Sequence, residues 1–138
     1  VLGMTRTYRV IIVGAGNLGS AITKYGGFAA WGFEIVAVVD VDDVKIGSPI
    51  DGLTIEPFDS VRTIVPERDV QIGVVATPPD AAQKAADELM AAGIRSILNL
   101  APVILKTRDD VIVRRVDLST ELGILAYHLS SASTDEAS

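Results

Sequence analysis

The sequence contains no cysteine and a single histidine, His128, and aromatic residues make up only 5% of its 138 residues. Without cysteine the chain forms neither a disulfide nor a cysteine-ligated zinc site, and we expect no metal site. No apolar run reaches the roughly 18 residues needed to cross a bilayer. The N-terminus lacks the basic and apolar regions of a signal peptide. We therefore expect a cytoplasmic protein with no membrane contact.

Positively charged residues are also scarce. The chain has 12 Lys and Arg against 18 Asp and Glu, which gives a net charge of −6. Affinity for nucleic acids depends largely on Lys and Arg at phosphates, so this chain alone is a poor DNA-binding surface. The length fits one domain. A hydrophobic fraction of 49%, carried by aliphatic residues, favours a parallel sheet that is buried on both faces.

A glycine motif follows the first apolar run, at 8–13. Gly14, Gly16 and Gly19 form G-x-G-x-x-G, and a helical pattern begins directly after them. In this context the first glycine permits a sharp turn, the second a close approach to a pyrophosphate, and the third close packing of helix on strand. The N–H groups at the helix N-terminus are suited to phosphates. The alternative is a strand-to-helix turn without a ligand.

An acidic residue is expected about 20 residues beyond such a motif, where it binds the adenosine ribose. Asp40 has this spacing and ends a second apolar run at 34–39. A carboxylate there repels a 2′-phosphate, which favours NAD over NADP, although nearby Lys45 weakens this argument. The alternative is a solvated loop acid.

Hydrophobic periodicity predicts strands that alternate with helices. The predicted strands are 8–13, 34–39, 53–55, 71–76, 94–98 and 111–116, and the predicted helices are 17–30, 60–65 and 80–92. Residues 42–52 are expected to be loop, and Pro66 to end the second helix. This alternation predicts an α/β fold with a Rossmann-like, doubly wound, mostly parallel sheet. The unusual residues that follow four of the strands should meet in one crevice, outside the carboxyl ends of the strands.

Residues 117–131 form a further predicted helix, with Asp117 as its N-cap. Leucines recur every three or four positions along it, which gives an apolar stripe. The stripe packs either on its own domain or on a second subunit. We expect the small polar tail at 132–138 to be disordered.

The sequence resembles the Rex family of redox-sensing transcriptional repressors from about residue 8 to 131. The resemblance rests on GAGNLG at 14–19 together with further segments: YGGF at 25–28, WGFEI at 31–35, VDVD at 39–42, KIG at 45–47, AAQ at 81–83, AGI at 92–94, ILNLAPV at 97–103 and VDLSTEL at 116–122. It departs from the family at Leu100, where phenylalanine is usual, and at Thr77, where valine is commoner.

The resemblance implies a sensor of the NADH/NAD balance that acts in a homodimer with a swapped C-terminal helix. It implies a linker remnant at 1–7, a Rossmann domain at 8–116 and a dimerisation helix at 117–131. Such repressors bind operator DNA through an N-terminal winged-helix domain, and we expect this chain to be the sensor half without it. The implied NAD(H) contacts are Gly14, Gly16, Asn17, Leu18, Gly19, Asp40, Asp42, Lys45, Thr77, Pro78, Pro79, Asn99, Ala101 and Pro102. Tyr25 and Asp117 resemble residues that communicate across the dimer.

Two other functions are open: the cofactor half of a dehydrogenase, and a nucleotide-sensing regulatory domain. A dehydrogenase needs a positioned general acid or base. The segments 76–79 and 99–103 contain no titratable side chain, so we expect no enzyme. An apolar surface near Leu100, Ala101 and Pro102 should disfavour the charged ring of oxidised nicotinamide, and NADH should bind better than NAD. Tyr25 is otherwise expected to be an ordinary buried aromatic residue.

Overall fold

The computed structural model describes residues 6–137, except for the side chains of 118, 119 and 132–137. Most of the predicted linker remnant therefore lies outside the described residues. The strands are β1 Tyr8–Val13, β2 Phe33–Asp40, β3 Pro49–Ile50, β4 Leu53–Pro57, β5 Ile72–Val75, β6 Ser96–Asn99 and β7 Ile112–Arg115. The helices are α1 Asn17–Lys24, α2 Val61–Glu67, α3 Pro79–Ala91 and α4 Leu118–Ala137, with 3₁₀ turns η1 Gly26–Trp31 and η2 Phe58–Ser60.

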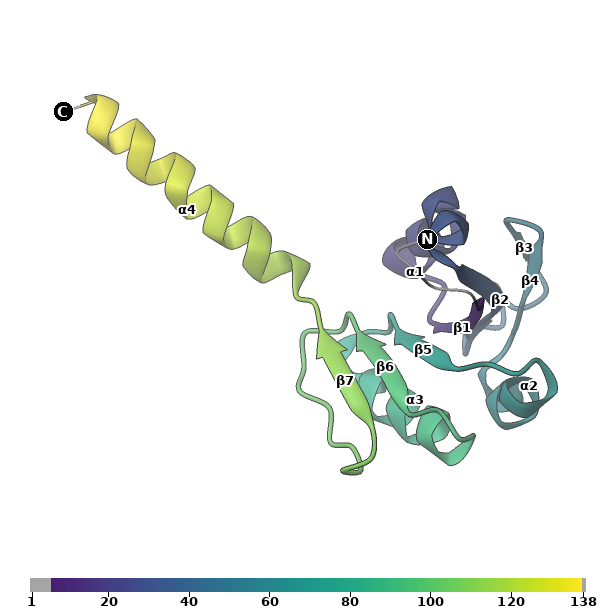
Figure 1. Cartoon of the computed structure of the whole chain (residues 1–138). Coiled ribbons are helices and arrows are strands. Elements are labelled where there is room, and N and C mark those ends of the chain that lie inside the picture. Colours follow the sequence, from purple (N-terminus) through teal and green to yellow (C-terminus); the bar gives the residue numbers. More distant parts are fainter. Residues whose placement is uncertain (1–5, 138) are drawn as a thin grey trace.

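The strands form one seven-stranded sheet in the order β3-β4-β2-β1-β5-β6-β7 (Figure 1). All neighbouring strands are parallel except β3 and β4. The chain runs outward from β1 through β2 to β4, and then crosses back to β5 on the other side of β1. This reversal between β1 and β5 is the switch point at which doubly wound sheets bind ligands. The predicted fold class is confirmed.

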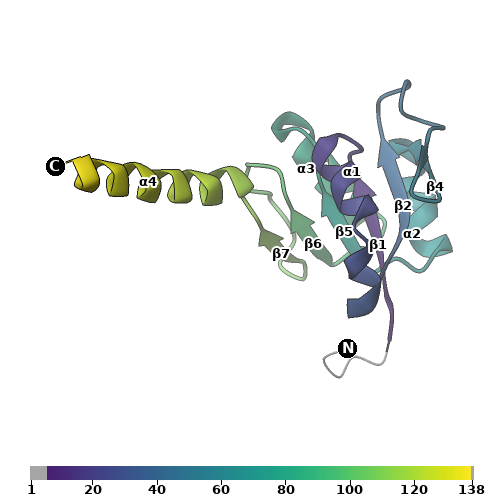
Figure 2. The ribbon, with the colours of Figure 1, turned by 90° about the horizontal axis from the view of Figure 1, so that it is seen from above.

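The sheet is covered on both faces because alternate residues of each strand point to opposite sides. Ile11, Val13 and Val39 belong to a core with residues of α2 and α3. Ile12 and Val38 belong to a second core on the face that α1 covers. Figure 2 shows α1 on one side of the sheet, with α2 and α3 on the other. Two-sided burial explains why the strands are continuous apolar runs.

The predicted helix at 17–30 is two elements, α1 and η1. Tyr25 separates them with an extended backbone (φ −69°, ψ 114°). The Gly26-Gly27 pair that follows has low helix propensity, which accounts for the break. The prediction that Pro66 ends the preceding helix is wrong, because α2 continues to Glu67 with Pro66 inside it. Pro66 is in the last turn of this short helix, where only one intrahelical hydrogen bond is lost.

The segment 42–52, which we expected to be loop, contains strand β3. It pairs with β4 in an antiparallel hairpin, across a turn at Asp51 and Gly52. Both turn residues have positive φ, 46° and 81°. This is the conformation that Asp-Gly adopts in tight hairpin turns, so the dipeptide contained a signal that the prediction missed.

The last helix, α4, extends away from the sheet beyond the edge strand β7 in both views (Figures 1 and 2). The carboxylate of Asp117 accepts a hydrogen bond from the Thr120 N–H at 3.1 Å, which confirms the predicted cap. The helix continues to Ala137, beyond residue 131 where we expected it to end. No glycine or proline interrupts residues 132–137, so nothing in the sequence ends the helix earlier.

The glycine turn depends on contacts between backbones. A Cβ on Gly19 would lie 1.8 Å from the carbonyl oxygen of Gly14, and one on Gly14 would lie 2.4 Å from that of Ala76. Gly14 also has a positive φ of 109°. Glycine at positions 14 and 19 therefore lets α1 pack closely on β1 and the segment after β5.

The Gly19→Ala substitution should lower the free energy of unfolding by about 3 kcal/mol or more, because backbone atoms cannot move aside as a side chain would. Urea denaturation measures this change. The matched control is Gly16→Ala, because a Cβ there meets nothing within 4 Å. Equal stability of the two variants would contradict the proposed role of the close backbone packing.

Candidate nucleotide-binding site

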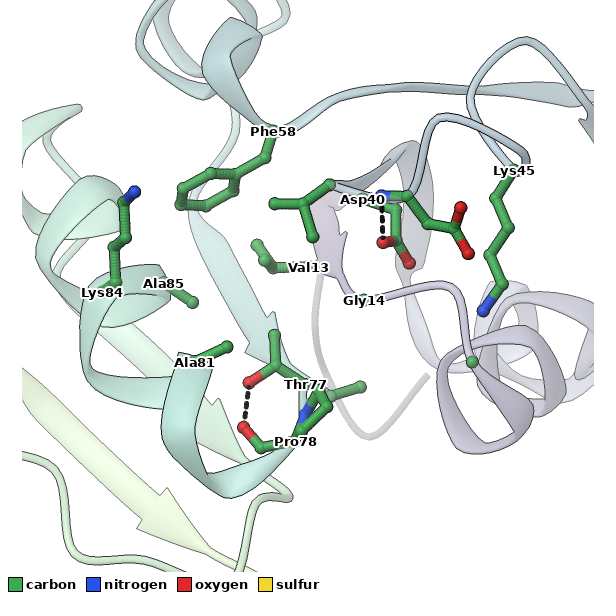
Figure 3. A pocket seen from close by; sticks show the side chains of 14 residues that line it. Val13, Gly14, Asp40, Lys45, Phe58, Thr77, Pro78, Ala81, Lys84 and Ala85 are labelled. Carbon is green, nitrogen blue, oxygen red and sulfur yellow. Dashed lines mark hydrogen bonds between the residues drawn. The ribbon is translucent and has the colours of Figure 1, made fainter.

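A pocket of about 250 Å³ lies where β1, β2 and β5 end (Figure 3). Its lining residues are Val13, Gly14, Gly16, Asp40, Val41, Asp42, Lys45, Phe58, Ala76, Thr77, Pro78, Ala81, Lys84 and Ala85. Three of the four strand ends predicted to converge do meet here. The pocket brings together seven of the predicted contacts: Gly14, Gly16, Asp40, Asp42, Lys45, Thr77 and Pro78.

Of the three glycines in the motif, Gly16 is the one at which no contact within the protein excludes a side chain. Its φ of −72° and ψ of −165° suit any residue, and a Cβ there would meet nothing within 4 Å. Gly16 lines the pocket and is the N-cap of α1. The space beside it is open to a ligand, which is the fit expected of the second glycine in a dinucleotide motif.

The first turn of α1 contains Asn17, Leu18 and Gly19, which are not among the pocket-lining residues. No side chain caps the helix, and no acidic residue lies in its first turn. The first N–H groups of a helix have no partner within it, and they carry the positive end of the helix dipole. What these residues offer a phosphate is therefore their backbone N–H groups.

The Asp40 carboxylate links β2 to the glycine turn. Its Oδ2 accepts a hydrogen bond from the Ala15 N–H at 2.7 Å, and its Oδ1 accepts one from the Asp42 N–H at 2.9 Å. Partial burial raises the pKa of Asp40, but hydrogen bonds from Ala15, Asp42 and Val41, together with the charge of Lys45, outweigh it and hold the pKa below its usual value. Asp40 is therefore an anchored and ionised group at the pocket wall.

The loop after Asp40 is ordered by Asp42. Its Oδ1 accepts a hydrogen bond from the Val44 N–H at 2.9 Å, and its carbonyl accepts one from the Lys45 N–H at 3.0 Å. This turn brings the Lys45 side chain to the same wall as Asp40 (Figure 3). The two charges attract each other, so Lys45 supports the ionised form of Asp40.

The Thr77 and Pro78 side of the pocket follows β5. The Thr77 hydroxyl donates to the Pro78 carbonyl at 3.0 Å, a contact that valine at this position would lack (Figure 3). Pro79 is exposed and outside the pocket lining. As the first residue of α3 it occupies a position where proline's missing N–H has no helical partner to lose.

The fourth strand end, after β6, does not contribute to the pocket. Asn99 is fully buried, its amide donates to the Val103 carbonyl at 2.8 Å, and its Oδ1 accepts from the Ala101 N–H at 3.0 Å. Ala101 is buried as well, whereas Pro102 is exposed. The Asn99 side chain thus shapes this turn, and only Pro102 and half-buried Leu100 present surface to a ligand.

Tyr25 and Asp117 also lie outside the pocket lining. Tyr25 is 59% exposed, so the expectation of an ordinary buried aromatic is wrong. Its ring contacts Phe28 edge to face at 4.8 Å and lies over Gly27, where a Cβ would be 2.3 Å from the ring. Asp117 caps α4 and pairs with Arg115 at 3.3 Å.

Sequence reasoning missed half of the pocket lining. The missed residues are Val13, Val41, Phe58, Ala76, Ala81, Lys84 and Ala85. Ala81 and Ala85 are four positions apart, so they share one face of α3, and this small-residue face was a readable signal. Phe58 reaches the pocket from η2, which no pattern in the sequence marks as part of a site.

A family model, the CoA binding domain, matches residues 5–103. The chain belongs to the CoA binding domain family. It is 48% identical over 99% of its length to the redox-sensing transcriptional repressor Rex of Streptomyces avermitilis, and 47% identical over 99% to that of Streptomyces coelicolor. These matches confirm the resemblance to Rex. The chain spans about half the length of these relatives, 54% and 53%.

Solved structures agree with this assignment. RSP, a Rex-family repressor crystallised with β-NADH, matches 98% of this chain and 65% of its own with a TM-score of 0.88 and 36% identity. RSP has also been crystallised with β-NAD⁺ and operator DNA. A dehydrogenase of Vibrio fischeri matches at 20% identity and a TM-score of 0.55, which shows a shared fold alone. Within residues 6–137, no helix combines the length and apolar character of a membrane span.

The Asp40→Asn substitution should reduce stability at neutral pH by an amount on the order of 1 kcal/mol, because the charged acceptor of two N–H groups is lost. The pKa of Asp40 is lowered in the folded protein, so its stabilisation is complete above the ordinary value of 3.8 and is lost as pH falls through the lower folded value. Urea unfolding at several pH values should show the variant and the parent converging in acid. A difference that is constant with pH would contradict this role of the carboxylate.

Proposed function

We propose that this chain is the NAD(H)-binding sensor domain of a redox-responsive transcriptional repressor and catalyses no reaction. The observation that carries the proposal is the Asp40 carboxylate, anchored in the pocket wall by the Ala15 N–H of the glycine turn, next to the open space at Gly16. A carboxylate accepts hydrogen bonds from the two hydroxyls of a ribose, and the turn and helix N-terminus suit a pyrophosphate. The similarity to Rex repressors supports the same reading.

The charge at Asp40 favours NAD(H) over NADP(H). Asp40 is ionised at neutral pH, and a 2′-phosphate would place a second negative charge against it. Lys45 offsets part of that repulsion, although its charge affects the pKa of Asp40 less than the backbone hydrogen bonds do. The predicted contacts Asp42, Thr77 and Pro78 complete the walls around the adenosine diphosphate half of the ligand.

The pocket suits the half of the ligand that is identical in NADH and NAD⁺, so redox discrimination needs another surface. The turn after β6 supplies one, since Leu100 and Pro102 present apolar surface, and Asn99 and Ala101 fix the backbone beneath them. Oxidised nicotinamide carries a positive ring charge, whose transfer to an apolar surface is unfavourable. The uncharged reduced ring lacks this penalty, so NADH binds more tightly.

The intact repressor would respond by a shift between two dimer conformations. If NADH binds the closed dimer better than the open one, rising NADH increases the closed population in proportion to that difference in affinity. A closed dimer that misplaces two DNA-binding domains would release the operator. We assign the sensing step to this chain and the DNA contact to another part of the intact repressor.

We also propose that α4 joins two copies in a homodimer. Leu122, Leu125 and Leu129 are 59–71% exposed in the single chain, an unusual state for an apolar stripe. The sheet face beside α1 has an apolar groove of about 260 Å³, lined by Val10, Ile22, Phe28, Phe33, Ile35, Ile72, Val74 and Leu98. Exchange of α4 between two copies would cover both surfaces.

Parallel calorimetric titrations with NADH, NAD⁺ and NADPH test the ligand. We expect NADH to bind at least about tenfold more tightly than NAD⁺, which corresponds to about 1.4 kcal/mol, and NADPH to bind weakly. Gly16→Ala should lower NADH affinity by about tenfold, because its methyl group enters the open space, and it should destabilise the fold far less than Gly19→Ala. Equal affinity for both redox states would refute redox sensing by this chain.

Light scattering of Leu125→Glu tests the dimer. A charge in the apolar stripe should convert the dimer to a monomer, since burying an unpaired carboxylate costs several kcal/mol. Thr120→Glu is the matched control, because Thr120 lies on the opposite side of α4 and should leave the dimer intact. A dimer that persists in Leu125→Glu would exclude the α4 stripe as the interface.

A further inference from the structure

The end of the pocket away from the glycine turn is lined mainly by apolar side chains. Ala81 and Ala85 are one turn apart on α3, and their small side chains leave space above the helix. The buried Phe58 ring lies beside them (Figure 3). Val41 also lines the pocket although it is 74% exposed. These side chains are all apolar, and together they form a slot suited to the faces of a flat aromatic ring.

Lys84 is the charged residue at this end. Its ammonium lies 6.0 Å from the centre of the Phe58 ring, at the edge of the slot (Figure 3). The acid one turn further along α3, Glu88, is engaged by Arg62 through two hydrogen bonds of 2.8 and 3.1 Å. Among the side chains that the structure describes, no carboxylate lies within 4.0 Å of Lys84. The charge of Lys84 helps to lower the pKa of Glu88, but Arg62 makes the hydrogen bonds to that carboxylate, so the donors of Lys84 remain available at the pocket.

We propose that Lys84 binds the adenine base of the dinucleotide. This proposal rests on the proposed function. The ring nitrogens of adenine at its edge accept hydrogen bonds, and an ammonium group has three donors and no acceptor. The apolar slot holds the faces of the base, and Lys84 donates to its edge. Asp40, next along the pocket, then meets the ribose attached to that base.

This assignment separates affinity from redox discrimination. Adenine is the same in NADH, NAD⁺ and ADP-ribose, so the Lys84 contact should contribute equally to the binding of all three. The ratio of NADH to NAD⁺ affinity should therefore not depend on Lys84. A group that acted on the nicotinamide end would change that ratio instead.

The test is calorimetric titration of Lys84→Met with NADH, NAD⁺ and ADP-ribose. We expect a loss of about fivefold to tenfold for each ligand, with an unchanged NADH/NAD⁺ ratio, as for one hydrogen bond from a charged donor in a partly exposed site. Lys24→Met is the matched control, because it removes the same charge from the exposed end of α1. Lys84→Arg keeps a charged donor and should recover part of the affinity.

A contact with the base should persist in about 0.5 M salt, where long-range attraction between exposed charges is screened. Three results would overturn the proposal: no loss in Lys84→Met, a loss that Lys24→Met matches, or a loss that disappears at high salt. A change in the NADH/NAD⁺ ratio would likewise reject the assignment to adenine. If the parent protein itself bound none of the three ligands, the proposed function would fail first.

Discussion

The site depends on one constraint, the contact between backbones at the carboxyl end of β1. Gly14 bends the chain against Ala76, and Gly19 brings the first turn of α1 against Gly14. Any side chain at these two positions would separate β1 from its neighbours at the switch point of the sheet. Because the contact is made by backbone atoms, it fixes the N-terminus of α1 at the pocket without a polar side chain.

A second link follows from the first. The turn presents the Ala15 N–H to Asp40, so the carboxylate at the end of β2 is oriented by the loop that follows β1. The hydrogen bonds that lower the pKa of Asp40 also restrict its rotation. An acceptor that is already ionised and oriented loses less entropy when a ligand binds, which raises affinity without adding contacts.

The sequence was informative where local chemistry determines the structure. The glycine spacing, the apolar runs and Asp40 predicted the sheet, the turn and the Asp40 wall of the pocket. Long-range packing was not readable in the same way. No pattern in the sequence marks Phe58 or Lys84 as part of a site. Asn99, which reads as a ligand contact, satisfies its amide within its own turn. A polar residue after a buried strand serves a ligand or its own backbone, and spacing alone does not distinguish these roles.

The pocket and the turn after β6 are separate, so the proposed sensor would bind the two halves of its ligand at different places. A pocket that held only the part shared by both redox states would stay occupied whichever form prevailed. The response then depends on the relative affinity at the turn, so it follows the NADH/NAD⁺ ratio rather than the amount of either. That turn connects through β7 directly to α4, whose apolar stripe is exposed in the single chain. A change at the nicotinamide end would therefore act on α4, which carries the proposed dimer contact. In this way a short stretch of the chain would couple the choice between NADH and NAD⁺ to the arrangement of the two subunits.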